Sequence, residues 1–255
     1  MAKITAIAIQ KGGQGKTVTA YALGAGLALR GQRVLFIDLD AQGNLSYTLG
    51  ADATGLAGRS AYEVLQGATT APEAVQHTPL GDIIASSPAL AAADTTLTAV
   101  GKEYRLREAL EALGGAYDRI ILDTPPSLGI ATVNALTAAD SLIIPAQADM
   151  YSLQGIGQLW QTIQTIRRYC NPRLFIDGIL LTRFNGRGVI SRDLSDMLAQ
   201  TAAQMETKVF KARIRECTAI KEAVAVKRDI YTYAPRSNAS ADYSAFIDEL
   251  LEGEG

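Results

Sequence analysis

The sequence predicts an α/β protein with a mostly parallel, twisted sheet that is flanked by helices on both faces. Short, almost purely apolar runs alternate along the chain with longer helix-forming segments, as parallel strands joined by helices require. Apolar residues make up 48% of the 255 residues, which is enough for a sizeable core. Aromatic content is only 6% whereas alanine is abundant, so helices can pack closely on a sheet. We expect one domain over residues 1–255.

The expected strands are the short apolar runs. They cover residues 4–9, 33–38, 81–85, 119–123, 141–145 and 174–182, with a further short strand around Val209.

The expected helices have local start and stop signals. Gly31 stands where the left-handed residue after the first helix belongs. Ser60 and Glu63 form a capping-box pattern for a short helix that Gly67 ends, and Pro72 indicates another helical start. Further helices are predicted over residues 18–30, 89–99, 106–113, 191–204 and 241–251, and a long amphipathic helix opens in the segment 147–159 and runs to about Arg168.

Residues 10–17, with the sequence QKGGQGKT, join the first strand to the first helix. The three glycines have no Cβ, so the backbone can bring several N–H groups around an oxyanion. The helix that follows adds unpaired N–H groups and the positive end of its dipole. In such a cradle Lys16 reaches the β- and γ-phosphates of a nucleotide, and the Thr17 hydroxyl is placed to bind Mg²⁺. A plain glycine turn does not explain why Lys11 and Lys16 flank the glycines.

The loop departs from the phosphate-loop pattern G-x-x-x-x-G-K-[ST], because Gln10 replaces the first glycine and Lys11 is added. KGGQGKT resembles the deviant Walker A loop, K-G-G-x-G-K-[ST], of the ParA/MinD group of P-loop ATPases, and in particular its ParA/Soj-type partition ATPases. The resemblance implies a P-loop NTPase fold and an ATP-bound dimer in which Lys11 reaches the partner's phosphates. Gln14 stands where valine is usual, at a position whose backbone makes the contacts, so we expect little consequence. The implied ATP-binding residues of the loop are Lys11, Gly12, Gly13, Gln14, Gly15, Lys16, Thr17 and Val18.

Two carboxylate segments follow predicted strands, where ligands bind in open parallel sheets. DLDAQGN contains Asp38 and Asp40, and a simple turn explains one aspartate better than two. DTPPSLG begins with Asp123 at the end of a strand, where an aspartate can hold Mg²⁺ directly or through water. These segments resemble the DxDPQGN switch and the Walker B region of the same family, although Ala41 replaces a proline.

The resemblance also assigns roles. It implies that Asp40 positions the attacking water and that Asp38 supports the Mg²⁺ shell. The implied catalytic residues are Lys11, Lys16 and Asp40, and the implied metal residues are Thr17, Asp38 and Asp123.

Three later segments extend the resemblance to about residue 247. QADMYSLQGIGQL resembles a stretch that family members use in the subunit interface, although a core-facing helix explains it equally well. Residues 211–223, KARIRECTAIKEA, resemble the family's segment near the adenine, with Arg215 matching the arginine of R-x-S-x-A. Lys211 and Arg213 are the implied ATP contacts there. YAPRSNASADY resembles the family's ending Y-x-P-x-S-x-x-A-x-x-Y.

Composition limits the possible functions. A net charge of -2 gives no overall attraction to nucleic acid, so DNA binding requires a local patch. Cys170 and Cys217 lack metal-ligand spacing, which favours inert thiols in a reducing compartment. His77 is the only histidine, which excludes His-pair metal sites and a Ser–His dyad; we expect it in a polar surface loop. The sequence shows no charged segment followed by a long apolar one, which is the pattern of a secretion signal. We therefore expect a cytoplasmic protein.

Basic residues gather in the last quarter of the chain. They are Lys208, Lys211, Arg213, Arg215, Lys221, Lys227, Arg228 and Arg236. A solvated helix face, balanced by nearby acidic residues, explains part of this pattern. ATP-bound dimers of the family bind DNA without sequence preference through this region, and dimerisation doubles the phosphate contacts. The best candidates for DNA binding are Lys211, Arg215 and Lys221.

The resemblance as a whole implies an ATPase that uses ATP and Mg²⁺, forms an ATP-dependent homodimer and segregates a plasmid, a chromosome region or a mobile element. It implies a ParB-like centromere-binding partner and non-specific DNA of the nucleoid. The alternative is a MinD-like positioning ATPase at the membrane, but the ending DELLEGEG is acidic and short for a membrane anchor, so we expect no membrane binding. A third possibility is a metabolic P-loop enzyme or an iron–sulfur ATPase, and the latter needs paired cysteines.

Overall fold

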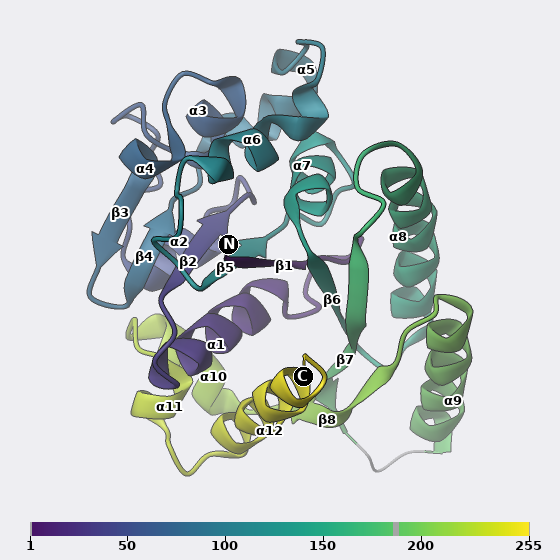
Figure 1. Cartoon of the computed structure of the whole chain (residues 1–255). Coiled ribbons are helices and arrows are strands. Elements are labelled where there is room, and N and C mark those ends of the chain that lie inside the picture. Colours follow the sequence, from purple (N-terminus) through teal and green to yellow (C-terminus); the bar gives the residue numbers. More distant parts are fainter. Residues whose placement is uncertain (1, 186–188, 255) are drawn as a thin grey trace.

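One eight-stranded sheet crosses the middle of the molecule (Figure 1). The computed structural model describes residues 2–185 and 189–254, and the sheet lies within them. In sheet order the strands are β3 (Val75–Thr78), β4 (Gly81–Ile84), β2 (Val34–Asp38), β5 (Arg119–Asp123), β1 (Lys3–Ile7), β6 (Ser141–Ala146), β7 (Phe175–Phe184) and β8 (Val209–Arg215). All neighbours are parallel except β3 and β4, so the predicted mostly parallel sheet is confirmed.

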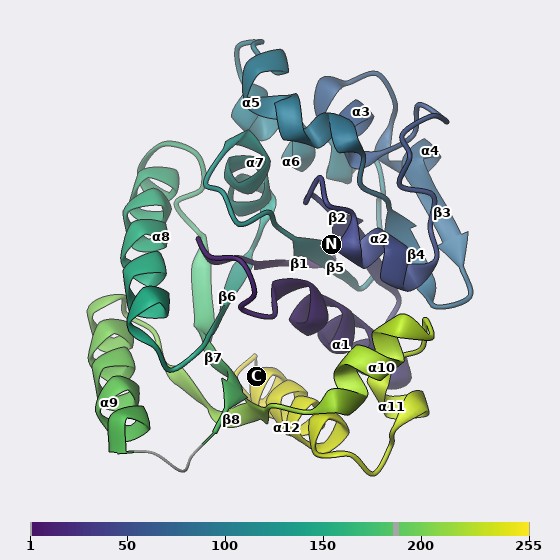
Figure 2. The ribbon, with the colours of Figure 1, turned by 180° about the vertical axis from the view of Figure 1, so that it is seen from behind.

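Helices cover both faces of this sheet, as Figure 1 and the reverse view in Figure 2 show. One face carries α3 (Ala61–Gln66), α4 (Ala71–Ala74), α5 (Ala93–Thr96), α6 (Arg105–Glu111), α7 (Ile130–Ala138), α8 (Met150–Tyr169) and α9 (Val189–Gln204). The other carries α1 (Lys16–Leu29), α2 (Asn44–Leu49) and α12 (Asn238–Glu252), with α10 (Thr218–Ala225) and α11 (Ile230–Tyr233) beside them. Two core clusters therefore fill the two sides.

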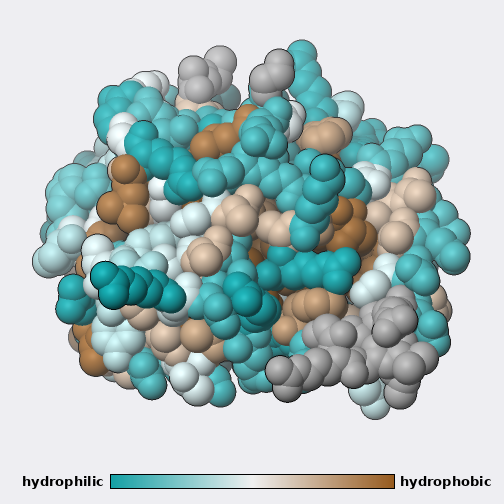
Figure 3. Space-filling view, turned by 90° about the horizontal axis from the view of Figure 1, so that it is seen from below, coloured by the Kyte–Doolittle hydropathy of each residue, from teal (hydrophilic) through white to brown (hydrophobic). Residues whose placement is uncertain are grey.

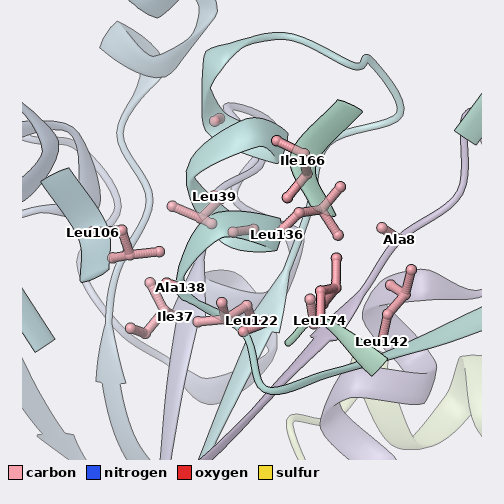
Figure 4. Packing of buried hydrophobic residues seen from close by; sticks show 14 of the residues in the cluster. Ala8, Ile37, Leu39, Leu106, Leu122, Leu136, Ala138, Leu142, Ile166 and Leu174 are labelled. Carbon is pink, nitrogen blue, oxygen red and sulfur yellow. The ribbon is translucent and has the colours of Figure 1, made fainter. Parts of the chain in front are cut away.

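Each strand contributes to both clusters because successive side chains point to opposite faces. In β1, Ala6 packs into the first cluster and Ile7 into the second. Figure 4 shows part of the first cluster, to which β5 contributes Leu122, β6 contributes Leu142 and α7 contributes Leu136. Each such fully buried side chain contributes about 2 kcal/mol. The buried central strands thus hold the loops at their carboxyl ends in fixed positions.

Helix α1 lies unusually close to the sheet. A Cβ added at Gly24 would stand 2.2 Å from Cε1 of Phe36 in β2, and one added at Gly26 would stand 2.3 Å from Cδ1 of Ile247 in α12. Small residues therefore allow α1 to pack between β2 and α12. This packing fixes the start of α1, which follows directly on the loop after β1.

The strand β3 was not predicted. His77 lies in it rather than in a loop, and it pairs with Asp82 of β4 in antiparallel register, with 2.7 Å between Nδ1 and Oδ1. The run VQHT is too polar and short to look like a strand, and it exists because the edge of β4 offers unpaired backbone groups. The expected exposure of the His77 side chain is confirmed.

The predicted helix over residues 89–99 is wrong as a single element. A 3₁₀ helix spans Pro88–Ala92, and α5 then covers Ala93–Thr96. The hydroxyls of Thr95 and Thr96 both donate to the Ala92 carbonyl, a local bond that competes with a continuing helix. A second 3₁₀ turn, Lys102–Tyr104, precedes α6.

Candidate active site

A cavity of about 460 Å³ opens at the carboxyl ends of the central strands. The phosphate-loop residues 12–18 form one wall. The remaining lining residues are Tyr21, Asp40, Gln42, Asn44, Tyr47, Thr48, Pro126, Arg183 and Val224. Gly12 and Val18, predicted from the loop pattern, are thus both at the cavity. The volume suits a mononucleotide-sized ligand.

The loop between β1 and α1 has the backbone that its glycines allow. Gly13 and Gly15 have φ values of 76° and 84°, in the left-handed region that favours glycine. Gly15 is the N-cap of α1 and has no side chain to satisfy the first N–H groups of the helix. Those N–H groups and the positive end of the helix dipole therefore remain available to an anion in the cavity.

Lys16 lies at the start of α1 and is 93% buried, since only 7% of its surface is exposed. Its Nζ donates to the Lys11 carbonyl at 3.0 Å. Burial lowers the pKa of the ammonium, and the nearby carboxylates of Asp123 and Asp40 oppose this shift. A buried cation that faces an anion-binding loop is suited to neutralising phosphate charge.

Asp38 and Asp123 end neighbouring strands. They are register partners in the pairing of β2 with β5, and both are fully buried. Burial raises the pKa of Asp38 to about 6, against the hydrogen bonds from Ser46 and from the Asp40 N–H. For Asp123, burial and the neighbouring Asp38 raise the pKa well above its usual range. Two buried carboxyls this close cannot both ionise easily without a cation.

The two carboxylates differ in their hydrogen bonds. Asp38 Oδ2 accepts from the N–H and the hydroxyl of Ser46, both at 2.8 Å, and Oδ1 accepts from the Asp40 N–H at 3.2 Å. Neither oxygen of Asp123 accepts a well-formed hydrogen bond within the described chain, although the Thr17 hydroxyl is near enough to lower its pKa. Asp123 therefore has free lone pairs, whereas those of Asp38 are largely used.

This donor set fits Mg²⁺. The orphaned oxygens of Asp123 and the hydroxyl of Thr17 are hard oxygen ligands. No group of three or more His, Cys, Asp or Glu residues that could hold a metal occurs in residues 2–185 and 189–254. Mg²⁺ bound with few protein ligands normally takes the rest from phosphates and water, so the site suits Mg²⁺ together with a nucleotide.

Asp40 lines the cavity on a turn after β2. Its Oδ1 accepts from the Gln42 N–H at 3.0 Å, and its carbonyl accepts from the Ser86 hydroxyl at 2.5 Å and from the Gly43 N–H at 2.8 Å. The turn is thus held from both sides even though Ala41 replaces the proline of the resembled pattern. Asp40 is half-buried, so its carboxylate can meet a water molecule in the cavity.

Lys11 is absent from the lining of the cavity. Its Nζ lies 3.0 Å from both carboxylate oxygens of Asp149, the N-cap of α8, and 5.2 Å from the centre of the Tyr151 ring. The two lysines of the loop therefore point to different places: Lys16 inward to the strand ends, and Lys11 outward to α8.

The side chain of Gln14 is a correction to the sequence analysis. We expected only its backbone to matter, yet it is 1% exposed and its Oε1 accepts from the Gln147 N–H at 2.9 Å and from the Ser152 hydroxyl at 2.8 Å. The Thr182 hydroxyl donates to the Gln14 carbonyl, and Gln147 Nε2 donates to the Gly13 carbonyl at 3.1 Å. The loop is therefore tied to the ends of β6 and β7 and to α8.

Lys211 and Arg213, predicted as ATP contacts, do not line the cavity. Lys211 is exposed on β8, and the Arg213 guanidinium lies 4.5 Å from the centre of the Phe184 ring. Phe184 follows Arg183, a lining residue with a φ of 48°. Arg213 thus packs against the residue that follows a lining residue and is not itself part of the lining.

The predicted DNA-binding residues lie on β8 and α10. Lys211, Arg213 and Arg215 alternate along the edge strand β8 and are exposed. Arg215 forms an ion pair with Asp242 of α12, with 2.7 Å between Nη2 and Oδ1. Lys221 is exposed on α10. We call the three predicted DNA-binding residues Lys211, Arg215 and Lys221 the basic stripe.

Sequence reasoning missed several residues of the cavity. Tyr21 lies on α1, Tyr47 and Thr48 on α2, and Val224 on α10. Lys227 covers the Tyr47 ring at 4.7 Å from its centre. The position of Arg183 near the carboxyl end of β7 was the one usable signal, because ligands bind beyond strand ends. The others come from helices whose approach to the cavity depends on tertiary packing.

Within the described residues, the helices are all too short or too polar to cross a membrane.

Comparison with known proteins places this arrangement in a family. A family model described as an AAA domain matches residues 2–176. The sporulation initiation inhibitor protein Soj of Bacillus subtilis is 37% identical over 253 residues, which cover 98% of each chain. The chromosome-partitioning ATPase Soj of Thermus thermophilus is 38% identical over 247 residues, 96% of this chain and 94% of that one.

Solved structures share the fold. A cobyrinic acid a,c-diamide synthase from Mycobacterium smegmatis, with a bound ATP analogue and magnesium, has a TM-score of 0.85 and 34% identity, covering 100% of this chain and 96% of that one. The ATP complex of Cyanothece McdA(D38A) has a TM-score of 0.87 and 25% identity, covering 98% and 96%. The fold is thus that of P-loop NTPases.

The family model covers more than half of the chain, and the two Soj proteins match the chain over nearly all of its length. Together with the loop that carries Lys11 and Lys16, these matches show that the chain belongs to the ParA/Soj-type partition ATPases of the deviant Walker A family.

Proposed function

We propose that residues 1–255 act as one Mg²⁺-dependent ATPase domain that hydrolyses ATP to ADP and phosphate and drives the partitioning of a plasmid, a chromosome or a mobile element. ATP is sandwiched in a homodimer that binds DNA non-specifically. A ParB-like centromere-binding protein stimulates hydrolysis. The protein works in the cytoplasm, on the nucleoid. The relative named as a chromosome-partitioning ATPase and the solved structures with ATP or an ATP analogue support this proposal.

One observation carries the two-chain mechanism. Lys16 serves the cavity of its own chain, whereas Lys11, on the same loop, lies outside that cavity. A lysine that does not serve the cavity of its own chain is available to complete the cavity of a second chain. Its position on a short glycine loop lets the ammonium move without disturbing the sheet.

Catalysis requires positioning and charge neutralisation rather than a protein nucleophile. The N–H groups of residues 12–18 and the start of α1 hold the phosphates, and Lys16 neutralises their charge. Thr17 and Asp123 would hold Mg²⁺, which supplies charge stabilisation on the phosphates when bound. Asp38 fixes Ser46 and the Asp40 turn and supports the metal shell. Asp40 orients the attacking water.

The basic stripe is the proposed DNA contact. A dimer doubles it, so DNA affinity depends on ATP and falls steeply with salt. Arg215 has to leave Asp242 or bind phosphate beside it, which makes Lys211 and Lys221 the stronger contributors. Neutralising each lysine should weaken binding to all sequences alike.

The packing of α12 disfavours the membrane alternative. Its apolar side chains Tyr243, Phe246, Ile247 and Leu250 are buried in the second core cluster. A helix whose apolar face is used in the core cannot insert that face into lipid. Figure 3, which looks from below Figure 1, shows hydrophilic residues with hydrophobic ones in separate small patches rather than one broad apolar surface.

ATP turnover with and without DNA and the adjacent gene's product tests the proposal. Lys16→Ala should lose ATP binding, and Lys11→Ala should lose stimulated turnover. Asp40→Ala should keep ATP, accumulate as a dimer in size-exclusion chromatography and turn over ATP at least about 100-fold more slowly. A monomeric Asp40→Ala protein with ATP bound would contradict the sandwich.

Two further arms separate the alternatives. Pelleting with anionic liposomes and ATP would support a membrane ATPase and count against the proposal. Turnover that responds to cobyrinic acid, but not to DNA, would favour the diamide synthase activity named for the Mycobacterium smegmatis relative.

A further inference from the structure

Lys11 is held in its own chain by the first turn of α8. Its ammonium is shared between the two oxygens of Asp149, at 3.0 Å each, and faces the Tyr151 ring. The side chains of Lys11 and Asp149 are 28% and 32% exposed, so the pair is only partly screened by water. Met150 and Tyr151 beside it are well exposed, at 59% and 72%. The pair thus lies on an open surface next to the cavity.

The carboxylate of Asp149 is fixed independently of Lys11. As N-cap of α8 it accepts from the Ser152 N–H at 2.7 Å, and the positive end of the helix dipole stabilises its charge. Burial raises the pKa of Asp149, but the Ser152 and Lys11 contacts outweigh it and the net pKa is lowered. Lys11 can therefore leave without removing the helix cap, because the bond from the Ser152 N–H does not involve it.

Hydrogen bonds connect the same turn of α8 to the phosphate loop. Gln14 accepts from Gln147 and Ser152, and Gln147 donates back to Gly13. The distance between Asp149 and the loop that carries Lys11 is therefore fixed by contacts that do not involve the ion pair. Asp149 is therefore a preorganised binding site for the Lys11 ammonium within the same chain.

We propose that Asp149 is a positioning residue for Lys11, holding the ammonium in cis, so that ATP-dependent pairing of two chains exchanges this carboxylate for the phosphates bound by the second chain. This inference rests on the proposed function. Asp149 touches Lys11 and the start of α8, not the cavity. The pair opposes dimerisation and sets the ATP concentration at which dimers form.

Removal of the Lys11–Asp149 ion pair should change the dimerisation equilibrium modestly for each chain and more for the dimer as a whole. A partly exposed ion pair shifts an equilibrium by about threefold. Both chains of a symmetric dimer must release their Lys11, so removing the pair should tighten the dimer Kd by about tenfold.

Asp149→Asn tests this, because an asparagine removes the charge but can still accept from the Ser152 N–H and cap α8. The dimer Kd is measured by analytical ultracentrifugation with Mg²⁺ and a non-hydrolysable ATP analogue, for the wild type, Asp149→Asn, Lys11→Ala and the double variant. We expect about tenfold tighter dimers for Asp149→Asn and no effect of it in the Lys11→Ala background. Asp149→Ser, another good N-cap, should reproduce the result.

Asp248→Asn is the matched control. Asp248 also pairs with a basic residue, Arg30, but on the α1–α12 side, so its loss should leave the dimer Kd unchanged.

The outcomes separate the two proposals. A wild-type dimer that Asp149→Asn leaves unchanged or weakens overturns the positioning role and leaves the proposed function standing. An effect of equal size in the Lys11→Ala background also overturns it, because the effect would not act through Lys11. If neither wild type nor variant dimerises with the ATP analogue, the proposed function itself fails. A dimer that forms only in Asp149→Asn supports the positioning role.

Discussion

Replacing Gln14 with valine, the residue usual at this position in the family, should destabilise this protein. In the folded chain the side-chain oxygen of Gln14 accepts from the Gln147 N–H and the Ser152 hydroxyl, and the residue is 1% exposed. Valine removes the acceptor but leaves both donors buried. The change therefore differs from a simple exchange of one core residue for another.

The magnitude follows from these two donors. A buried donor without a partner costs about 1–3 kcal/mol. The Gln147 N–H can still reach the Ser152 oxygen at 3.3 Å, so part of the loss is recovered. Burial of the valine methyl groups recovers about 1 kcal/mol more. We expect a net loss of about 2 kcal/mol in the free energy of unfolding, or a fall in Tm of about 4–8 °C for a chain of this size.

Urea unfolding followed by circular dichroism measures the loss, with Gln161→Val on the exposed face of α8 as control. The control should stay within about 0.5 kcal/mol of the wild type. In a double-mutant cycle, Ser152→Ala should cost less in the Gln14→Val background than in the wild type, with a coupling of about 1 kcal/mol. A Gln14→Val protein as stable as the control, without this coupling, would refute the role we give to the side chain.

Three other predictions test the packing, the carboxylates and the chain end. Gly24→Ala should lose about 1–3 kcal/mol of stability because the new methyl meets Phe36, whereas Gly157→Ala, with open space on α8, should gain about 0.5–1 kcal/mol; thermal melts of both decide this. The raised pKa of Asp38 gives a contribution to stability that is complete below its unfolded pKa near 4 and is lost as pH rises to about 6. Urea titrations at pH 4.5 and 7 should therefore show that the free energy of unfolding of Asp38→Asn rises relative to that of the wild type at the higher pH. With Mg²⁺ and ATP present, the wild type should instead be the more stable of the two at pH 7. Glu254→Gln should cost about 1–2 kcal/mol in the same titrations, because the carboxylate accepts two hydrogen bonds from the guanidinium of Arg119, whose side chain is only 10% exposed; an unchanged midpoint would show that the pair contributes nothing.

Local patterns predicted much of the fold. β5 has the bounds that its apolar run RIILD indicated, and the capping box at Ser60 and Glu63 starts α3 as expected. Such features depend on residues that are near in sequence. The edge strand β3 and the helix α7 had no comparable signal, since VQHT is polar and the apolar residues of α7 point in nearly every direction. β3 forms because it pairs with β4, and α7 forms because neighbouring elements cover it.

The same division holds at the site. The loop glycines, Lys16 and the strand-end Asp38 and Asp123 come together because strand, loop and helix follow each other in sequence or pair in the sheet. The contacts of Gln14 reach residues 133 and 138 positions away, and no local pattern specifies them. The family pattern predicted that the side chain of Gln14 has little effect, whereas the tertiary structure shows that it is buried and has two hydrogen-bond partners.

The place of β1 in the sheet has a consequence for synthesis on the ribosome. Lys3 is the register partner of Arg119, and Thr5 is that of Ser141, so the first strand made waits for neighbours more than 100 residues downstream. At about 5–20 residues per second, the nascent chain spends on the order of ten seconds with its nucleotide loop unsupported. A fragment that stops before β5 should bind no ATP, and mutations that slow the late pairing should expose the emerging chain to chaperones and proteases.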